Sequence, residues 1–264
     1  MIGAIIGDYV GSAYEFAPTK NYNFKLVTPA SSITDDTIMS LAIADALMQP
    51  TVEPDYRERM LYWGRKYPNP KGGYGGSFNN WLHSPDPQPY NSFGNGSAMR
   101  VAAIGWVFSD LQTVQAQAVA SAEVTHNHVE GIRGAVATAT AVWLARNGYD
   151  RNAIRAEVEK LGYSLEFSIV NIKPSYGFYE TCQLTVPVAI RCFYESHSYE
   201  DCIRMAVSLG GDADTLACIA GAIAEAYYGE ASIDGELVAQ ALATLPQDLL
   251  DVYLRFRERF VLGQ

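Results

Sequence analysis

The chain has 264 residues, of which 48% are apolar and 18% charged, and its formal net charge is −10. This composition supports a full buried core, and since no Pro/Ser-rich, charged or low-complexity linker interrupts it, we expect one domain over residues 1–264. The negative charge argues against nucleic acid or an anionic membrane surface as the main partner, and no run approaches the ~20 apolar residues that span a bilayer.

The first predicted element is a helix, because apolar residues recur at helical spacing from Ile2 to Ala13. Asp8 and Glu15 lie seven residues apart, so they would share one face of that helix if it continued. The same segment lacks the basic residues of a signal peptide and is interrupted by Asp8. We therefore expect a cytoplasmic protein.

Helical spacing also dominates the rest of the chain. A strand-like alternation worth noting occurs over Phe167–Val170. Gly- and Pro-rich stretches over 67–77 and 83–96 predict long ordered loops, which are usually functional in a compact domain. Apolar stripes predict further helices over 38–48, 113–124, 132–146, 181–195, 199–208, 215–228, 236–243 and 247–260. The pattern as a whole predicts an all-α fold, a compact orthogonal helix bundle.

Two acidic clusters stand at the starts of predicted helices and are near copies of each other. Thr34-Asp35-Asp36-Thr37 precedes one apolar run, and Asp212-Ala213-Asp214-Thr215 precedes another. For either cluster alone, helix capping is the default interpretation. Four carboxylates exceed what two caps require, and oxygen ligands without sulfur or imidazole select Mg²⁺, Mn²⁺ or Ca²⁺. If the fold joins the two helix starts, they would form a site for two cations about 4 Å apart.

Two further motifs lie between the acidic clusters. The segment Gly94-Asn95-Gly96-Ser97-Ala98-Met99-Arg100 predicts a tight turn and a helix that Ser97 caps, or a loop whose amides bind an anion. Arg100 is alternatively a structural ion-pair partner. Thr125-His126-Asn127-His128 predicts a break between helices, because residues at i and i+2 cannot share a helix face. His126 is then either a hydrogen-bonded structural residue or a contact to ribose or phosphate.

These segments, in this order, resemble the ADP-ribosylglycohydrolase family, which includes the dinitrogenase reductase-activating glycohydrolase and the ADP-ribosyl-arginine hydrolases. The resemblance implies the all-α fold of that family and a binuclear Mg²⁺ or Mn²⁺ centre. Val129 departs from the family, which often has proline there; this changes the stiffness of the loop but not the chemistry. The matching motifs are Gly7-Asp8-x-x-Gly11-x-x-x-Glu15, Thr34-Asp35-Asp36-Thr37-x-Met39, Gly94 to Arg100, Thr125 to His128, and Gly211 to Thr215.

The resemblance also implies roles for individual residues. Glu15 would lie beside the metals as a ligand or as the general base, with Asp36 as the second candidate base. The metal ligands would be Thr34, Asp35, Asp36, Asp212, Asp214 and Thr215. The substrate-binding residues would be Gly96 and Ser97 at the diphosphate with Gly94, Asn95 and Met99 of the same motif, His126 and Asn127 near the adenosine, and Tyr176 or Phe178 on the adenine.

The implied reaction is metal-dependent hydrolysis of the glycosidic bond between the distal ribose of ADP-ribose and an acceptor, on a protein or a small molecule. The acceptor stays open between arginine, serine, a nucleic-acid base and an acetyl group, and we expect the rim loops 67–92 and 164–180 to select it. One alternative is a non-catalytic module that binds ADP-ribose. Another is a metal-dependent diphosphate lyase of the terpene-synthase type, which Met39 disfavours because that class resembles Asp-Asp-x-x-Asp.

Overall fold

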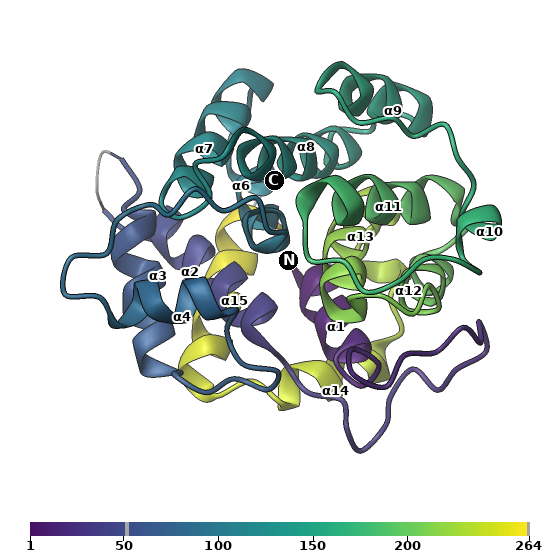
Figure 1. The fold of residues 1–264 in the computed structure, drawn as a ribbon, viewed down its shortest axis with the longest axis horizontal. Coiled ribbons are helices and arrows are strands. Elements are labelled where there is room, and N and C mark those ends of the chain that lie inside the picture. The colour runs from purple at the N-terminus through teal and green to yellow at the C-terminus, as the bar shows by residue number, and fades with distance from the viewer. Residues whose placement is uncertain (51–52, 263–264) are drawn as a thin grey trace.

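The computed structural model describes residues 1–50 and 53–262, and helices make up its regular secondary structure (Figure 1). Two isolated backbone bridges, Thr34–Lys71 and Gly94–Thr181, are the nearest approach to a sheet among the described residues. The elements are α1 (Ile2–Gly11), α2 (Asp35–Met48), α3 (Tyr56–Lys66), α4 (Gly76–His83), α5 (Gly96–Met99), η1 (Val101–Ala103), α6 (Ile104–Val107), α7 (Leu111–Glu123), α8 (Val129–Arg146), α9 (Arg151–Lys160), α10 (Ile169–Ile172), α11 (Cys182–Glu195), α12 (Tyr199–Val207), α13 (Ala213–Tyr228), η2 (Glu230–Ser232), α14 (Gly235–Ala243) and α15 (Gln247–Phe260). The predicted all-α fold is confirmed, and within the described ranges no helix is long and apolar enough to cross a lipid bilayer.

Every predicted apolar stripe forms a helix, although the ends are displaced. Helix α7 begins at Leu111, before the stripe, because the Asp110 side chain accepts a hydrogen bond from the backbone N of Thr113 and so caps the helix. Helices α3 and α9 were not predicted. In α9 the buried residues are Ile154 and Val158, so the apolar stripe is narrow. The surrounding charged residues make the helical spacing of these apolar residues hard to recognise in the sequence.

The strand expectation for Phe167–Val170 is wrong. Ile169 and Val170 belong to the helical turn α10, which follows Ser168. Four alternating residues cannot form a stable strand without a neighbouring strand, and the described part of the chain offers none.

The expectation that Asp8 and Glu15 share a helix face is also wrong, because α1 ends at Gly11. The Ser12 hydroxyl donates to the carbonyl of Tyr9, which competes with a further helical turn. The Ser12 carbonyl instead accepts a hydrogen bond from the Lys71 ammonium group, 2.8 Å away. Glu15 therefore sits in the turn after α1 and is not restricted to the direction of the helix.

Helix α13 lies at the centre of the core, and α1 packs along it (Figure 1). Three glycines of α1, namely Gly3, Gly7 and Gly11, face the backbone of α13. A Cβ atom on Gly7 would lie 2.0 Å from the carbonyl oxygen of Ala217, and one on Gly11 would lie 2.5 Å from the Cα of Asp214. The lack of side chains lets the two backbones meet, and so brings the end of α1 to the start of α13.

Candidate active site

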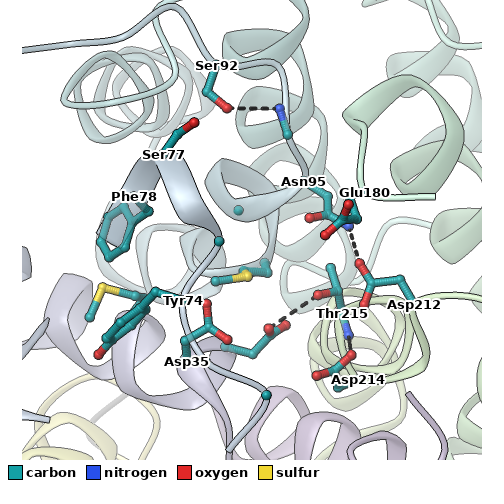
Figure 2. Close-up of a pocket in the computed structure, with 18 of the residues that line it drawn as sticks. Asp35, Tyr74, Ser77, Phe78, Ser92, Asn95, Glu180, Asp212, Asp214 and Thr215 are labelled. Carbon is teal, nitrogen blue, oxygen red and sulfur yellow. Dashed lines mark hydrogen bonds between the residues drawn. The ribbon is translucent and has the colours of Figure 1, made fainter. Parts of the chain in front are cut away.

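A cavity of about 520 Å³ lies between the starts of α2 and α13 and the loop that carries Gly94 and Gly96. Figure 2 shows the carboxylates of Asp35, Asp212 and Asp214 toward one end and Ser77 and Ser92 toward the other. Among the described lining residues, Arg100 is the single lysine or arginine. Five of the lining carboxylates form what we call the acidic cluster: Glu15, Asp35, Asp36, Asp212 and Asp214.

The start of α2 is held by a carboxylate from another helix. Thr34 is the N-cap, and its hydroxyl accepts a hydrogen bond from the backbone N of Asp36. The buried Asp8 of α1 accepts from the backbone N and hydroxyl of Thr34, at 2.9 and 2.8 Å, and from the same two groups of Thr37. Asp8 thus acts as a second cap for α2, supplied by α1 of the same chain. This cap fixes Asp35 and Asp36 at the cavity wall.

The start of α13 is built differently from an ordinary cap. Asp212 occupies the N-cap position without capping the helix; its Oδ2 accepts instead from the Asn95 side-chain amide at 2.7 Å. The Thr215 hydroxyl donates to Asp36 Oδ2 at 3.2 Å, which links α13 to α2 directly. The fold therefore brings the two acidic helix starts together, although they lie far apart in the sequence.

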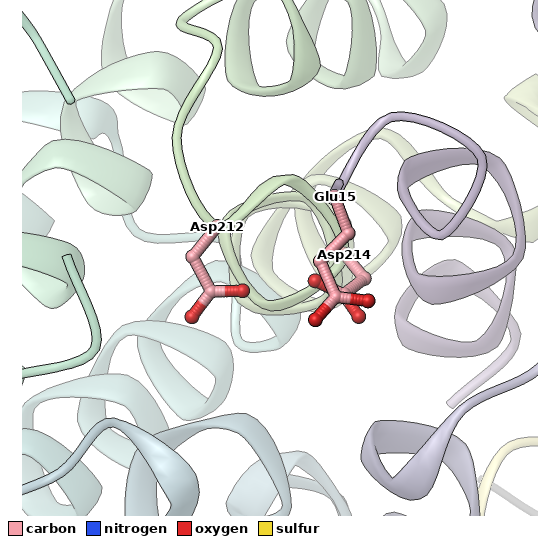
Figure 3. Close-up of side chains that lie close together, drawn as sticks. All are labelled: Glu15, Asp212 and Asp214. Atoms are coloured by element: carbon pink, nitrogen blue, oxygen red, sulfur yellow. The ribbon is translucent and has the colours of Figure 1, made fainter. Parts of the chain in front are cut away.

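Glu15 completes this arrangement from the turn after α1. Figure 3 shows its carboxylate beside that of Asp214, with Asp212 next to both. One oxygen from each of these three residues lies within 4.8 Å of the others. The backbone of Gly72, at φ +80°, passes over Glu15, and a Cβ there would lie 3.0 Å from Glu15 Oε2. Glycine at this position suits both the positive φ and the close approach.

The acidic cluster is electrostatically strained in the absence of a cation. Burial first, and the charge of Asp214 second, raise the pKa of Asp35, Asp36 and Asp212 well above the usual aspartate value. The same two causes raise the pKa of Glu15 to about 8. These carboxylates repel one another in a partly dry site, so a positive charge placed among them would lower the free energy of their ionised forms.

The hydrogen bonding shows where such a charge fits. Glu15 Oε2 and Asp36 Oδ1 are buried and have no hydrogen-bond partner among the described residues. Buried polar atoms in native proteins nearly always have partners, so two orphaned oxygens on carboxylates that line one cavity indicate a site for a ligand. Because the donor set is oxygen from carboxylates and a threonine hydroxyl, it suits a hard divalent cation.

The sequence comparisons agree with this site. Residues 1–261 match the sequence model of a family described as ADP-ribosylglycohydrolase. The chain belongs to this family. A mouse relative named ADP-ribosylhydrolase ARH3 is 30% identical, with 87% of this chain and 82% of the relative covered. The family and its curated members are ADP-ribosyl hydrolases, so the chain is a member of a family of enzymes.

Two bacterial relatives and one solved structure extend the comparison. ADP-ribosylarginine hydrolase Tri1 of Pseudomonas putida is 27% identical over 95% of this chain and 76% of the relative. ADP-ribosyl-[dinitrogen reductase] glycohydrolase of Rhodospirillum rubrum is 26% identical over 86% and 84%. A structure titled ADP-ribosylglycohydrolase-related protein complex superposes with a TM-score of 0.73 at 24% identity, covering 97% of this chain and 96% of that one. This last likeness supports the fold.

Most of the residues predicted for this ADP-ribosylglycohydrolase site line the cavity, and four lie elsewhere. The Thr34 hydroxyl is buried between Asp8 and Asp36. Ser97 lies inside α5 and donates to the carbonyl of Gly131, so it does not cap that helix. The predicted residues that do line the cavity are Glu15, Asp35, Asp36, Gly94, Asn95, Gly96, Met99, His126, Asp212, Asp214 and Thr215.

Asn127 and Tyr176 are the other two predicted residues outside this cavity. Asn127 is exposed, and its side-chain oxygen accepts from the backbone N of Asn91, which fixes the loop before Gly94. Tyr176 packs its ring on Gly211 and lines a second, separate cavity. Phe178, two residues later, faces the acidic cavity instead. Both assignments to adenosine stay predictions.

Four aromatic residues of the cavity were missed by sequence reasoning. Tyr74, Phe78 and Tyr90 line it, and Phe16 stacks on the predicted Phe178 with ring centroids 6.4 Å apart. Tyr74, Phe78 and Tyr90 lie in or beside the two loops predicted to be functional, but nothing in the sequence shows which side of a loop an aromatic ring faces.

Proposed function

We propose that this chain hydrolyses the glycosidic bond between the distal ribose of ADP-ribose and an acceptor, on a protein or a small molecule. The observation that carries the proposal is the acidic cluster with its two orphaned oxygens, placed in one cavity with the loop that carries Gly94 and Gly96. A cavity of about 520 Å³ is in the usual range for a small-molecule ligand. Membership of the ADP-ribosylglycohydrolase family supports the choice of ligand.

We further propose that the acidic cluster holds two Mg²⁺ or Mn²⁺ ions. Asp35, Asp36, Asp212, Asp214 and Thr215 would be ligands, with Thr34 positioned behind them and Glu15 at the edge. When bound, divalent cations would orient ribose hydroxyls and lower the pKa of a bound water. The carboxylates of the cluster repel one another, and this repulsion supports the proposal that cations with a total charge of at least +2 bind among them.

Glu15 is the candidate general base. It lines the cavity, and its Oε2 has no hydrogen-bond partner among the described residues, so this carboxylate would be available to accept a proton from a water at the anomeric carbon. Asp36 is the second candidate, but its Oδ2 already accepts from Thr215. Cleavage passes through a positively charged, oxocarbenium-like state, which the surrounding carboxylates would stabilise.

The test is release of ADP-ribose from defined ADP-ribosylated substrates, including arginine- and serine-linked proteins, with Mg²⁺ or Mn²⁺ present. We expect the wild-type chain to release ADP-ribose from at least one of them, and Asp212→Asn and Asp36→Asn to lose at least a hundredfold in rate. Glu236→Gln, an exposed carboxylate on α14, is the matched control and should match the wild type.

The outcomes separate the alternatives. Unchanged activity in either aspartate variant would contradict the role given to the acidic cluster. Tight binding of ADP-ribose with no release from any substrate, cation present, would make the chain a binding module. Turnover of a prenyl diphosphate would favour the lyase alternative.

A further inference from the structure

The second cavity, which Tyr176 lines, has a volume of about 580 Å³, against about 520 Å³ for the cavity of the acidic cluster. No described residue lines both cavities. The segment 178–180 lies between them: Phe178 and Glu180 line the acidic cavity, and Tyr179 lines the second one. The second cavity is therefore a separate space, which the proposed function does not use.

One wall of the second cavity is apolar. It includes the rings of Phe167, Tyr176 and Tyr179, and the last two pack edge to face with centroids 5.2 Å apart. Leu184 of α11 belongs to the same wall and is 45% exposed. A wall of aromatic and aliphatic side chains suits a ligand with an apolar ring, which can bury its faces and edges against them.

Two buried oxygen atoms of residues that line this cavity have no hydrogen-bond partner in the described part of the chain. They are Glu130 Oε2 on α8 and Tyr163 Oη in the loop after α9. Tyr163 is 5% exposed, so bulk solvent does not replace the missing partner. Buried polar atoms nearly always have partners, and this includes the hydroxyl of a buried tyrosine. Two such atoms beside one cavity indicate a polar group on a ligand.

The charge of Glu130 is already balanced within the protein. Its Oε1 accepts a hydrogen bond from Arg133 Nη1, in an ion pair between adjacent turns of α8. The Arg133 guanidinium also lies over the ring of Tyr163, with Cζ 6.0 Å from the ring centroid. A ligand at this end of the cavity therefore needs no net charge. It must offer a hydrogen-bond donor, because a carboxylate oxygen can only accept.

A single hydroxyl group matches both unpartnered oxygens, because it donates one hydrogen bond and accepts others. It can donate to Glu130 Oε2 and accept from the Tyr163 hydroxyl. Burial first, and then the charges of Cys182 and Glu130, raise the pKa of Tyr163, so its hydroxyl keeps the proton that it would donate. Because Glu130 contributes to this shift, its carboxylate lies near the Tyr163 hydroxyl.

We propose that the second cavity binds a small neutral aromatic molecule that carries a hydroxyl group. Its ring would pack on the apolar wall, and its hydroxyl would bond to Glu130 and Tyr163. The site adjoins the start of α13, because a Cβ on Gly211 would lie 2.6 Å from the Tyr176 ring and Asp212 follows Gly211. It shares no lining residue with the acidic cavity, so the proposal does not rest on the proposed function.

The first measurement is a titration of the ¹⁵N-labelled full chain with para-cresol, followed by ¹H–¹⁵N NMR. We expect saturable shifts of the backbone amide signals of Gly162, Ser164 and Gln183, which line the cavity. The methyl ether of para-cresol keeps the ring but cannot donate a hydrogen bond. It should bind about tenfold more weakly, the effect of one hydrogen bond to a charged group.

The second measurement compares two variants that each lose one tyrosine hydroxyl. Tyr163→Phe should weaken the binding of para-cresol about fivefold, the effect of one neutral hydrogen bond. Its urea denaturation midpoint should not fall, because this hydroxyl has no partner in the fold, whereas a structural role would lower it. The matched control is Tyr149→Phe, an exposed tyrosine after α8 that does not line the cavity and should bind para-cresol as the wild type does.

A third variant fills the cavity from its exposed side. Leu184→Trp adds an indole ring to the apolar wall, and we expect it to keep the wild-type denaturation midpoint and to abolish the saturable shifts. Leu254→Trp on α15 starts from the same 45% exposure and should leave the binding of para-cresol unchanged.

Three results would each overturn the proposal. One is the absence of amide shifts in the wild type up to the solubility limit of para-cresol. Another is equal affinity for para-cresol and its methyl ether, which would mean apolar adsorption only. The third is a Tyr163→Phe protein that is less stable yet binds para-cresol as well as Tyr149→Phe does. None of these measurements involves ADP-ribose, so a failure of the proposed function is detected separately.

Discussion

At the scale of single residues, Asp8 shows how a buried carboxylate can serve the site without touching a ligand. It accepts four hydrogen bonds from Thr34 and Thr37, and these bonds join α1 to the first turn of α2. Burial first and the charge of Asp214 second raise its pKa to about 7, so the carboxylate is costly and is kept because its partners are well placed.

Replacing Asp8 by asparagine should therefore be far from conservative. Asp8→Asn replaces one carboxylate oxygen by an NH₂ group. This group would face at least one of the four N–H and O–H donors of Thr34 and Thr37, and buried donors would be left unpaired. We expect the free energy of unfolding to fall by about 1–3 kcal/mol and cation-dependent activity to be lost. Urea denaturation measures the first effect. Asp150→Asn is the control, since asparagine caps a helix as well as aspartate does; equal stability of the two variants would argue against the role of Asp8.

At the scale of elements, the site depends on how closely α1 and α13 pack. Ridges of side chains normally keep helix axes 8–10 Å apart, and glycine removes those ridges. The three glycines of α1 place the end of that helix, and with it Glu15, beside Asp212 and Asp214. Together with α8, α11 and α12, which also pack on α13, this contact buries Ala213–Glu225 completely.

Adding one methyl group to this contact tests it. Gly7→Ala would place Cβ 2.0 Å from the carbonyl oxygen of Ala217, which cannot move without its helix. We expect destabilisation by about 1–3 kcal/mol, seen as a lower denaturation midpoint with an unchanged slope. Gly235→Ala, in open space at the start of α14, should be neutral or slightly stabilising. A Gly7→Ala protein as stable as Gly235→Ala would show that the helices are not in such close contact.

At the scale of the whole molecule, the acidic cluster joins segments from both ends of the chain. Glu15 follows α1, Asp35 and Asp36 begin α2, and Asp212 and Asp214 stand at the start of α13. A ligand that binds all of these segments binds the folded chain and has little affinity for the unfolded one. Cation binding should therefore appear as global stability.

We expect Mg²⁺ or Mn²⁺ to raise the melting temperature of the chain by a few degrees. At 100 times its Kd a cation adds about 2.7 kcal/mol to the stability of the fold. Differential scanning fluorimetry with added cation, and then with a chelator, measures the change, with KCl of equal ionic strength as the blank. Asp214→Asn should lose most of the shift and Glu236→Gln should keep it. If the wild type melts at one temperature in all three buffers, the acidic cluster does not bind these ions.

Most of the helices, and the acidic character of the site, could be predicted from the amino-acid sequence alone. Apolar residues at helical spacing need only their neighbours in the chain, so most of the helices were predictable. The doubled Asp-Thr segments indicated a cation site because four carboxylates exceed what two caps need. The charged helices α3 and α9 were not predicted, because their apolar stripes are narrow.

Which residues meet became apparent from the folded chain. It separated Glu15 from the face of Asp8, directed Thr34 and Ser97 to hydrogen bonds within the protein, and turned Phe178 rather than Tyr176 toward the acidic cavity. It also paired Arg100 with the Thr125 hydroxyl, and with no carboxylate among the described residues, which corrects the alternative of a structural ion pair. These outcomes depend on close contacts between segments distant in sequence, such as α1 on α13. The spacing of residues along a helix gives the face on which a side chain lies, but not which distant segment packs against that face.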